Sequence, residues 1–281
     1  MGEFNIKFSK WQGAGNDFIY IDGRNADINY ADFAKKYCDR HFGIGADGVL
    51  VLENTNKADV RMRIINPDGT EPEMCGNGIR CFARALYDYG IIKNEEFTVE
   101  TGAGILTPKI VAENGKVSGV TVDMGKPRLN AAEIPIVGFG SEKVINRTLE
   151  VLGKTYNITC VSMGNPHCVV FVDDIKKCDI ESIGRHFETH GAFPRKTNTE
   201  FVQVIDETHL RMRVWERGAA ITLACGTGAC ASLVAAVLNE RAKRRAEVKL
   251  DGGALKIEWK DDGRIFMTGP AELVFEGEIN D

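Results

Sequence analysis

Two cysteines of this sequence occur in the same short motif, and the motif is a candidate for acid/base chemistry. Cys75 opens CGNG and Cys225 opens CGTG, and each motif lies between a strand-like segment and a helical pattern. Each cysteine should therefore lie at the N-terminus of a helix, where about half a positive charge favours a thiolate. A thiol placed there can have its pKa lowered from about 8.5 to roughly 3.5–7.5. The backbone N–H groups that follow can also bind a carboxylate.

If two such helix ends converge on one substrate, their sulfur atoms can lie on opposite sides of the carbon next to a bound carboxylate. A thiolate then removes the Cα proton from one face, and a thiol delivers a proton to the other. The helix N–H groups stabilise the developing negative charge. This chemistry inverts an amino acid without pyridoxal phosphate, a metal or a nicotinamide. The other cysteines lack this context and are expected to be packing residues: Cys38, Cys81, Cys160, Cys168, Cys178 and Cys230.

The two motifs belong to an internal repeat, because both halves of the chain carry the same landmarks in the same order. Asn16 in GAGNDF is matched by Asn165 in MGNPH, an offset of 165 − 16 = 149. Cys75 is matched by Cys225, an offset of 225 − 75 = 150. Further matches in order are Arg40–Phe42 with Arg185–Phe187, Arg61–Arg63 with Arg211–Arg213, and Gly102–Leu106 with Gly252–Lys256. We therefore expect two similar α+β halves, with a ligand site where they meet.

Local patterns predict the elements that position these motifs. The first helix of one half begins near Asn29, which can cap it, and ends at Gly43, while its counterpart runs from Asp179 to Gly191. Its apolar residues at helical spacing are Phe33, Tyr37 and Phe42. Runs of β-branched and aromatic residues predict the strands Phe18–Ile21, Val49–Leu52 and Val60–Ile65.

The second helix of each half follows the cysteine motif. After CGNG the apolar stripe consists of Ile79, Phe82, Ala83 and Leu86, and Gly90 is the expected stop. The helix after CGTG is apolar on nearly all sides. Such a helix should be buried inside a wrapped sheet instead of lying on a surface.

The composition narrows the possible partners. The chain has 281 residues, 43% of them hydrophobic and 27% charged, with a net charge of −5. This charge balance gives no basic surface for nucleic acid. The sequence contains no apolar run long enough for a membrane helix, and we expect a cytoplasmic protein with thiols rather than disulfides. The spacing of cysteines and histidines does not fit a structural zinc site.

The longest motif, NPDGTEPEMCGNGIRC at residues 66–81, together with GNDF, MGNPH, ERG and ACGTGAC, resembles the signature blocks of the diaminopimelate epimerase family. The resemblance extends over essentially the whole chain. It implies cofactor-independent epimerisation of the small amino acid LL-diaminopimelate to meso-diaminopimelate, a step in lysine and peptidoglycan-precursor biosynthesis. It further implies a homodimer.

The resemblance also implies a fold and a set of residue roles. The fold would be α+β, with two pseudo-symmetric halves, 1–125 and 126–269, each a sheet wrapped round a central helix. The last strand, about 270–281, would return to the first half, and the active site would lie at the seam. Cys75 and Cys225 would transfer protons, with His167 and Glu216 tuning the thiol pKa values. The residues expected to bind substrate are Asn16, Asn66, Gly76, Asn77, Asn165, Asn198, Glu216, Arg217, Gly226 and Thr227.

Three other functions fit parts of the sequence. The sequence GIGADG at residues 43–48 matches a dinucleotide-binding pattern, but it follows a helix and enters a strand, which is the wrong context. A related cofactor-free racemase would keep both cysteines and change the distal pocket, but this sequence retains the distal polar residues Asn66, Asn165, Asn198, Glu216 and Arg217. Gly48, Ala220 and Ile221 depart from residues common in the family, which bears on fine substrate contacts and not on the chemistry. A redox sensor would join the two thiols in a disulfide and would not need the distal polar set.

Overall fold

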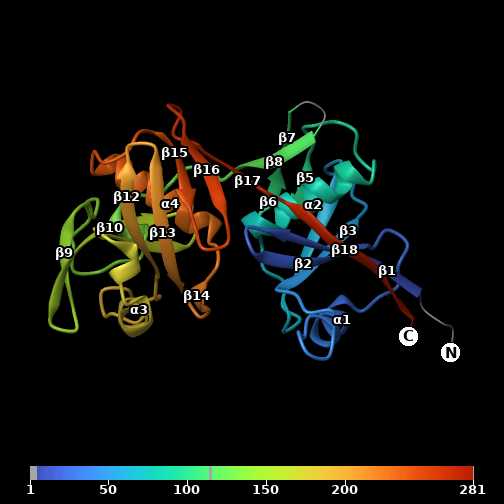
Figure 1. Ribbon diagram of the computed structural model, residues 1–281, viewed down its shortest axis with the longest axis horizontal. Coiled ribbons are helices and arrows are strands. Elements are labelled where there is room, and N and C mark those ends of the chain that lie inside the picture. Colours follow the sequence, from blue (N-terminus) through green and yellow to red (C-terminus); the bar gives the residue numbers. More distant parts are fainter. Residues whose placement is uncertain (1–4, 114–115, 281) are drawn as a thin grey trace. The chain divides into compact units, whose positions relative to one another are not determined.

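The structure is a computed structural model that describes residues 5–113 and 116–280. The chain forms two compact units (Figure 1). Unit 1 comprises Met1–Asp123 and Gly269–Asp281, and unit 2 comprises Met124–Thr268. No helix in the described ranges has the length and apolar character needed to cross a membrane.

Unit 1 combines a sheet, a hairpin and the helices α1 and α2. The sheet has the strand order β18-β1-β2-β3-β4-β5-β6, and β7 and β8 form the hairpin. Helix α2 packs against β1, β2 and β4 of the sheet and also against the hairpin. The elements are β1 (Asn5–Gly13), β2 (Asn16–Asp22), α1 (Tyr30–Tyr37), β3 (Gly48–Glu53), β4 (Val60–Ile65), α2 (Gly76–Asp88), β5 (Val99–Thr101), β6 (Gly104–Leu106), β7 (Lys109–Glu113), β8 (Lys116–Asp123) and β18 (Glu272–Asn280).

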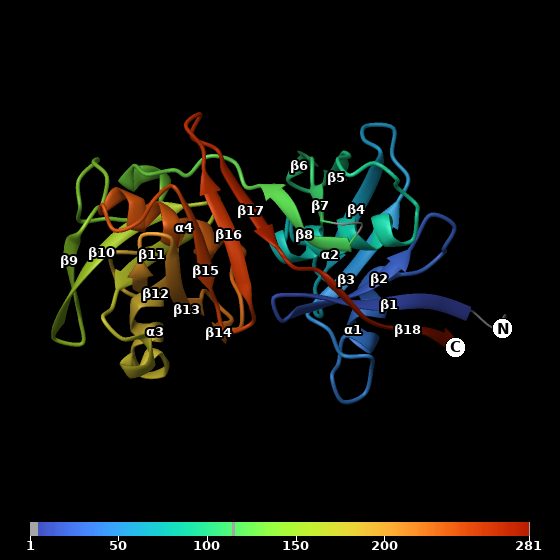
Figure 2. The same cartoon turned by 45° about the horizontal axis from the view of Figure 1, so that its top comes forward.

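Unit 2 surrounds helix α4 with strands, as Figure 2 shows. Its strands follow the order β17-β16-β15-β13-β12-β11-β10-β9, and β14 pairs with β13. The elements are the short helix η1 (Ala131–Glu133), β9 (Arg147–Val151), β10 (Lys154–Ser162), β11 (Pro166–Phe171), the short helix η2 (Ile175–Lys177), α3 (Ile180–Glu188), β12 (Asn198–Asp206), β13 (His209–Glu216), β14 (Ala220–Thr222), α4 (Gly226–Leu238), β15 (Arg245–Lys249), β16 (Ala254–Trp259) and β17 (Ile265–Gly269).

Both units use the same sequence of strand pairings. Strand β2 pairs in parallel with β3 across α1, and β11 pairs in parallel with β12 across α3. Strand β4 likewise pairs in parallel with β5 across α2, and β13 with β15 across α4. The register agrees as well, because Phe18 pairs with Gly48 and His167 pairs with Asn198. These positions differ by 167 − 18 = 149 and 198 − 48 = 150, the offsets of the sequence repeat.

Helix α4 is buried because its sequence offers strands an apolar surface on every side. Its residues from Gly226 to Ala236 are buried apart from Thr227, and β10, β11, β12, β13, β15 and β16 pack against it. Helix α2 keeps a polar face and buries the predicted stripe of Ile79, Phe82, Ala83 and Leu86. Gly90, with φ of +65°, follows its last turn. The predicted α+β fold, with sheets wrapped round central helices, is confirmed.

The first helix is shorter than its pattern predicted. Asn29 caps α1, since its side chain accepts a hydrogen bond from the N–H of Asp32, but the helix ends at Tyr37 and Phe42 is 93% exposed. Asp39 explains the early end, because its carboxylate accepts from the backbone N–H groups of His41 and Phe42 and closes a turn. The counterpart α3 similarly starts after the cap Asp179 but ends at Glu188 rather than Gly191.

Candidate active site

Both cysteine motifs place sulfur at the cap of a helix, as the sequence predicted. Cys75 is the N-cap of α2, with φ −138° and ψ 117°, and its Sγ accepts a hydrogen bond of 3.4 Å from the N–H of Gly78. Cys225 is the N-cap of α4, with φ −127° and ψ 109°, and its Sγ accepts at 3.4 Å from Gly228. Sulfur thus occupies the position where a hydroxyl or carboxylate oxygen usually satisfies the exposed N–H groups of a helix.

Asn16 and Asn77 belong to the hydrogen-bonded group at the sulfur of Cys75. The Cys75 thiol lies 3.7 Å from Oδ1 of Asn16 and donates to it. The same oxygen accepts from Nδ2 of Asn77 at 3.1 Å. Nδ2 of Asn16 donates to Asp47 at 2.6 Å, so the carboxamide is fixed with its oxygen facing the thiol. The structure therefore brings together three of the predicted site residues in unit 1.

A charged network that the sequence analysis missed supports Asn16 from behind. Arg40 donates to both Asp47 and Asp17 at 2.7 Å, and the buried Lys10 forms an ion pair of 2.7 Å with Asp17. Burial alone would raise the pKa of Asp17, but the hydrogen bonds from Arg40 and Lys10 hold that pKa well below its usual value. Asp17 is thus a carboxylate at neutral pH.

Arg80 holds the first turn of α2 from inside. It is fully buried and donates to Oδ1 of Asn77 at 2.8 Å, to the carbonyl of Gly76 at 3.0 Å and to that of Pro270 at 3.3 Å. This fixes the carboxamide of Asn77 with its Nδ2 toward Asn16. Arg80 therefore fixes the first turn of α2 and connects it to the segment that leads into β18.

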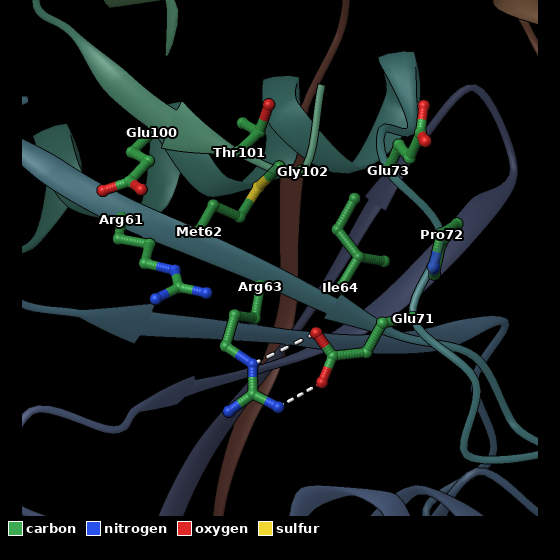
Figure 3. Close-up of a pocket in the computed structure, with 10 residues that line it drawn as sticks. All are labelled: Arg61, Met62, Arg63, Ile64, Glu71, Pro72, Glu73, Glu100, Thr101 and Gly102. Carbon is green, nitrogen blue, oxygen red and sulfur yellow. Dashed lines mark hydrogen bonds and ion pairs between the residues drawn. The ribbon is translucent and has the colours of Figure 1, made fainter. Parts of the chain in front are cut away.

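Asn66 lies in a turn of its own, away from these contacts. Its Nδ2 donates to Thr70 at 2.9 Å. The following segment lines an open pocket beside β4, shown in Figure 3, whose lining includes Arg63 and Glu71, joined by two hydrogen bonds. Glu73 is tied to the chain by the N–H of Ala103, which donates to its carbonyl at 3.0 Å. These contacts anchor the segment that leads to Cys75, but the pocket lining contains none of the predicted site residues.

In unit 2 a chain of side chains ends at the sulfur of Cys225. The hydroxyl of Thr227 is 3.5 Å from Sγ. Asn165 donates from Nδ2 to that hydroxyl at 3.2 Å, and its Oδ1 lies 3.0 Å from Nε2 of His167. The structure therefore connects four residues that the sequence assigned to the site. Nδ1 of His167 in turn lies 2.6 Å from Oε1 of Glu200.

The predicted distal group forms a second cluster at the end of β13. Asn198 accepts from the N–H of Arg217 at 2.8 Å and donates to the carbonyl of Pro166 at 3.0 Å. The Arg217 guanidinium donates to the carbonyl of Arg195 at 3.1 Å, and no carboxylate in residues 5–113 or 116–280 forms an ion pair with it. Glu216 accepts a hydrogen bond from Thr222.

The pKa of Cys225 is opposite to the expectation from its helix end. Burial raises the pKa of this thiol well above its ordinary value, and the nearby Glu216 raises it further, against the hydrogen bonds from Thr227 and Gly228. The prediction of a lowered pKa is therefore wrong for Cys225, because the residue is only 5% exposed and lies near the charge of Glu216. Burial also raises the pKa of Cys38 to about 11 and that of Cys81 to about 12, consistent with packing roles.

Glu200 is the main residue of unit 2 that sequence reasoning missed. It is fully buried on β12 beside His167 on β11. The available signal was a glutamate within the apolar strand sequence TEFVQV, at the offset of 200 − 50 = 150 from Leu50. Its partner could not be identified without the parallel pairing of β11 and β12.

Solved structures share this fold at low sequence identity. A PhzF-family phenazine biosynthesis protein of Bacillus anthracis has a TM-score of 0.71 at 20% identity, with 98% of this chain and 99% of that chain covered. A hydroxyproline epimerase of Agrobacterium vitis has a TM-score of 0.67 at 14% identity, covering 98% of this chain and 92% of that chain. At these identities the likeness describes the fold alone.

Sequence comparisons are more specific. The family model described as diaminopimelate epimerase matches residues 8–130 and 159–274. The diaminopimelate epimerase 1 of Nostoc sp. is 55% identical, covering 98% of this chain and 99% of its own length. The diaminopimelate epimerase of Desulfitobacterium hafniense is 53% identical, with 98% of each chain covered. On these matches and on the paired cysteine caps, the chain belongs to the diaminopimelate epimerase family.

Proposed function

We propose that this chain epimerises LL-diaminopimelate to meso-diaminopimelate by proton transfer between Cys75, Cys225 and one Cα of the substrate. Each half of the chain, 1–125 with the last strand and 126–269, supplies one thiol. The observation that carries the proposal is the duplicated cap, in which a sulfur accepts from the first turn of a central helix and lies beside polar side chains. The printed names of the relatives supply the substrate.

The two thiols have different environments, and this assigns their roles. Burial and the nearby Glu216 raise the pKa of Cys225, so it holds its proton and acts as the acid when LL-diaminopimelate is the substrate. Cys75 then acts as the thiolate that removes the Cα proton, with the N–H of Gly78 donating to its sulfur. In the reverse direction the roles exchange.

The first turns of α2 and α4 provide the groups that bind the reacting end of the substrate. The N–H groups of Gly76, Asn77, Gly226 and Thr227 belong to helix starts, where backbone donors lack partners within the helix. They would bind the α-carboxylate and stabilise the charge that develops on it when Cα loses its proton. Both proton transfers use protein thiols, so the proposed reaction takes no cofactor, and it suits a reducing cytoplasm.

The distal end of the substrate would be bound by the cluster around Arg217. A guanidinium can take a carboxylate through two parallel hydrogen bonds. Asn66, Asn165 and Glu216 have oxygens that can accept from the distal ammonium, while Asn198 holds the backbone of Arg217 in place. A related racemase with another substrate is the second candidate, and this cluster is what distinguishes the two.

The first prediction concerns the two thiols. In deuterated water with LL-diaminopimelate and no added cofactor, the wild type should form meso-diaminopimelate and introduce deuterium at Cα. Cys75→Ala and Cys225→Ala should each abolish turnover, because each removes the proton-transfer group on one face. Cys178→Ala, which removes a half-buried thiol outside the site, is the matched control and should retain activity. Turnover within about tenfold of wild type in either site variant would exclude the two-thiol mechanism.

The second prediction concerns pH. Because the pKa of Cys225 is raised, its acid form persists to higher pH, and kcat/KM should fall on the alkaline side only above the ordinary thiol value of about 8.5. Glu216→Gln removes a negative neighbour, so the pKa of Cys225 should drop and the alkaline limb should move to lower pH. Glu207→Gln, in the turn before β13, should leave the limb in place. A shift of the alkaline limb to higher pH in Glu216→Gln would contradict the assignment of Cys225 as the acid.

The third prediction concerns the distal carboxylate. Arg217→Ala leaves that charge unpaired and should cost about 2–5 kcal/mol of transition-state binding, which is roughly thirty-fold to several thousand-fold in kcat/KM. Arg217→Lys should remain impaired, because a point charge lacks the two-donor fork. Arg195→Ala is the control, since its contact to Arg217 uses the backbone carbonyl. Equal wild-type rates on diaminopimelate, lysine and alanine would favour the second candidate.

We also propose a homodimer that forms through strand β18. This edge strand exposes three consecutive apolar residues, Leu273, Val274 and Phe275, so both of its faces offer apolar surface. Light scattering should give about twice the chain mass of 30.9 kDa. Val274→Asp should yield monomers, while Ile105→Asp on β6, at the opposite edge of the same sheet, should not. A wild-type monomer at micromolar concentration would refute the proposal.

A further inference from the structure

A polar pair is buried beneath the first turn of α4, where a fold of this kind would normally place apolar side chains. His167 and Glu200 are both 0% exposed, and Nδ1 and Oε1 lie 2.6 Å apart. The other oxygen of Glu200, Oε2, has no hydrogen-bond partner among the described residues. A buried acid with an unpaired oxygen lowers stability, so its presence calls for a reason other than packing.

Unit 1 shows that the fold itself does not require this pair. The positions equivalent to His167 and Glu200, at offsets 149 and 150, are Phe18 and Leu50, in the same parallel strand pair. A Cβ on Gly78 would lie 3.2 Å from Leu50 and 3.6 Å from Phe18. A Cβ on the equivalent Gly228 would instead lie 2.7 Å from Oε1 of Glu200. The same place is therefore filled by apolar residues in one unit and by an acid and an imidazole in the other.

The pair determines the direction of the hydrogen bonds that lead to Cys225. Oδ1 of Asn165 can only accept, so the hydrogen of the contact between His167 and Asn165 lies on Nε2 of His167. Nε2 then donates to Oδ1 of Asn165, whose Nδ2 donates to the Thr227 hydroxyl. That hydroxyl can then direct its own hydrogen to Sγ of Cys225 at 3.5 Å. In this arrangement every donor of the chain points toward the sulfur.

The charge state of Glu200 agrees with this arrangement. Burial raises the pKa of Glu200, against the influence of His167. An oxygen without a donor is also less costly on an uncharged acid than on a carboxylate. Glu200 is therefore an acid that donates to Nδ1 of His167, which leaves the imidazole hydrogen on Nε2.

We propose that Glu200 is a positioning residue for the epimerisation: by holding His167 in the Nε2–H form it fixes the carboxamide of Asn165, and through Asn165 it keeps the Thr227 hydroxyl donating to Cys225. This inference rests on the proposed role of Cys225. Without Glu200, the hydrogen of the His167 imidazole can move to Nδ1, and the carboxamide of Asn165 can rotate so that its Nδ2 faces His167. The Thr227 hydroxyl would then donate to Asn165, and the sulfur would lose a donor when it gives up its proton.

The chain itself suggests the decisive variant, because unit 1 shows which apolar pair fits. His167→Phe/Glu200→Leu installs the pair of unit 1 in unit 2. It should fold with a Tm no lower than that of the wild type, since replacing a buried polar pair by apolar residues of similar volume is often neutral or stabilising. Its kcat/KM should nevertheless fall by about 10–100-fold, the usual effect of losing an orienting partner. A folded double variant with wild-type kcat/KM would show that the pair only fills space.

Single variants separate positioning from charge. Glu200→Gln can still donate to Nδ1 and should retain kcat/KM within about threefold, whereas Glu200→Leu, equally uncharged, should match the loss of the double variant. Equal losses in both variants would mean that charge, not the hydrogen bond, is what matters. Thr199→Val is the control, since it removes a neighbouring buried hydroxyl that has no partner among the described residues, and it should leave kcat/KM unchanged.

Nitrogen NMR of ¹⁵N-histidine protein reads the tautomer without reference to activity. His167 is assigned among the five histidines by its absence from the double variant. A protonated Nε2 in the wild type and in Glu200→Gln supports the proposal, and an unprotonated Nε2 overturns it even if the double variant does not fold. If instead the wild type failed to epimerise diaminopimelate while Nε2 was protonated, the proposed function would be wrong and the tautomer assignment would stand.

Discussion

The hydrogen bond from a first-turn N–H to a cysteine sulfur is the constraint on which both halves of this structure depend. A central helix enclosed by strands has to end its N-terminus inside the protein, where exposed N–H groups are costly without partners. In both units a thiol meets this need through the glycine three residues later. In the proposed function the capping atom is also the reacting atom, so the residue that starts the helix could not be exchanged without changing the reactive group.

The glycine in each cap follows from the close approach of the sheet. A Cβ on Gly78 would press on Leu50 at 3.2 Å, and a Cβ on Gly228 would lie 2.7 Å from Oε1 of Glu200, so that a neighbour would have to shift in each unit. The CGxG pattern is therefore a packing requirement as well as a source of backbone donors. What differs between the units is the polarity of the side chain below, and this difference makes the two thiols inequivalent within a duplicated fold.

Sequence reasoning succeeded where the signal was local. The cap of α1 at Asn29, the apolar helix after CGTG and the strands β2 to β4 all follow from patterns within a few residues. It failed where distant segments meet. The early end of α1 depends on the side chain of Asp39 competing for backbone donors. The raised pKa of Cys225 depends on burial and on Glu216 of β13, and Glu200 meets His167 from 33 residues away in the sequence.

The supports of the two thiols also differ in their access to solvent ions. In unit 1, Arg40 holds Asp47 and Asp17 with a side chain that is 55% exposed. In unit 2 the pair behind Asn165 is 0% exposed on both sides. Mobile ions screen exposed charges over a Debye length of about 8 Å at physiological ionic strength and reach buried pairs far less. Ionic strength therefore acts on the support of Asn16 far more than on that of Asn165.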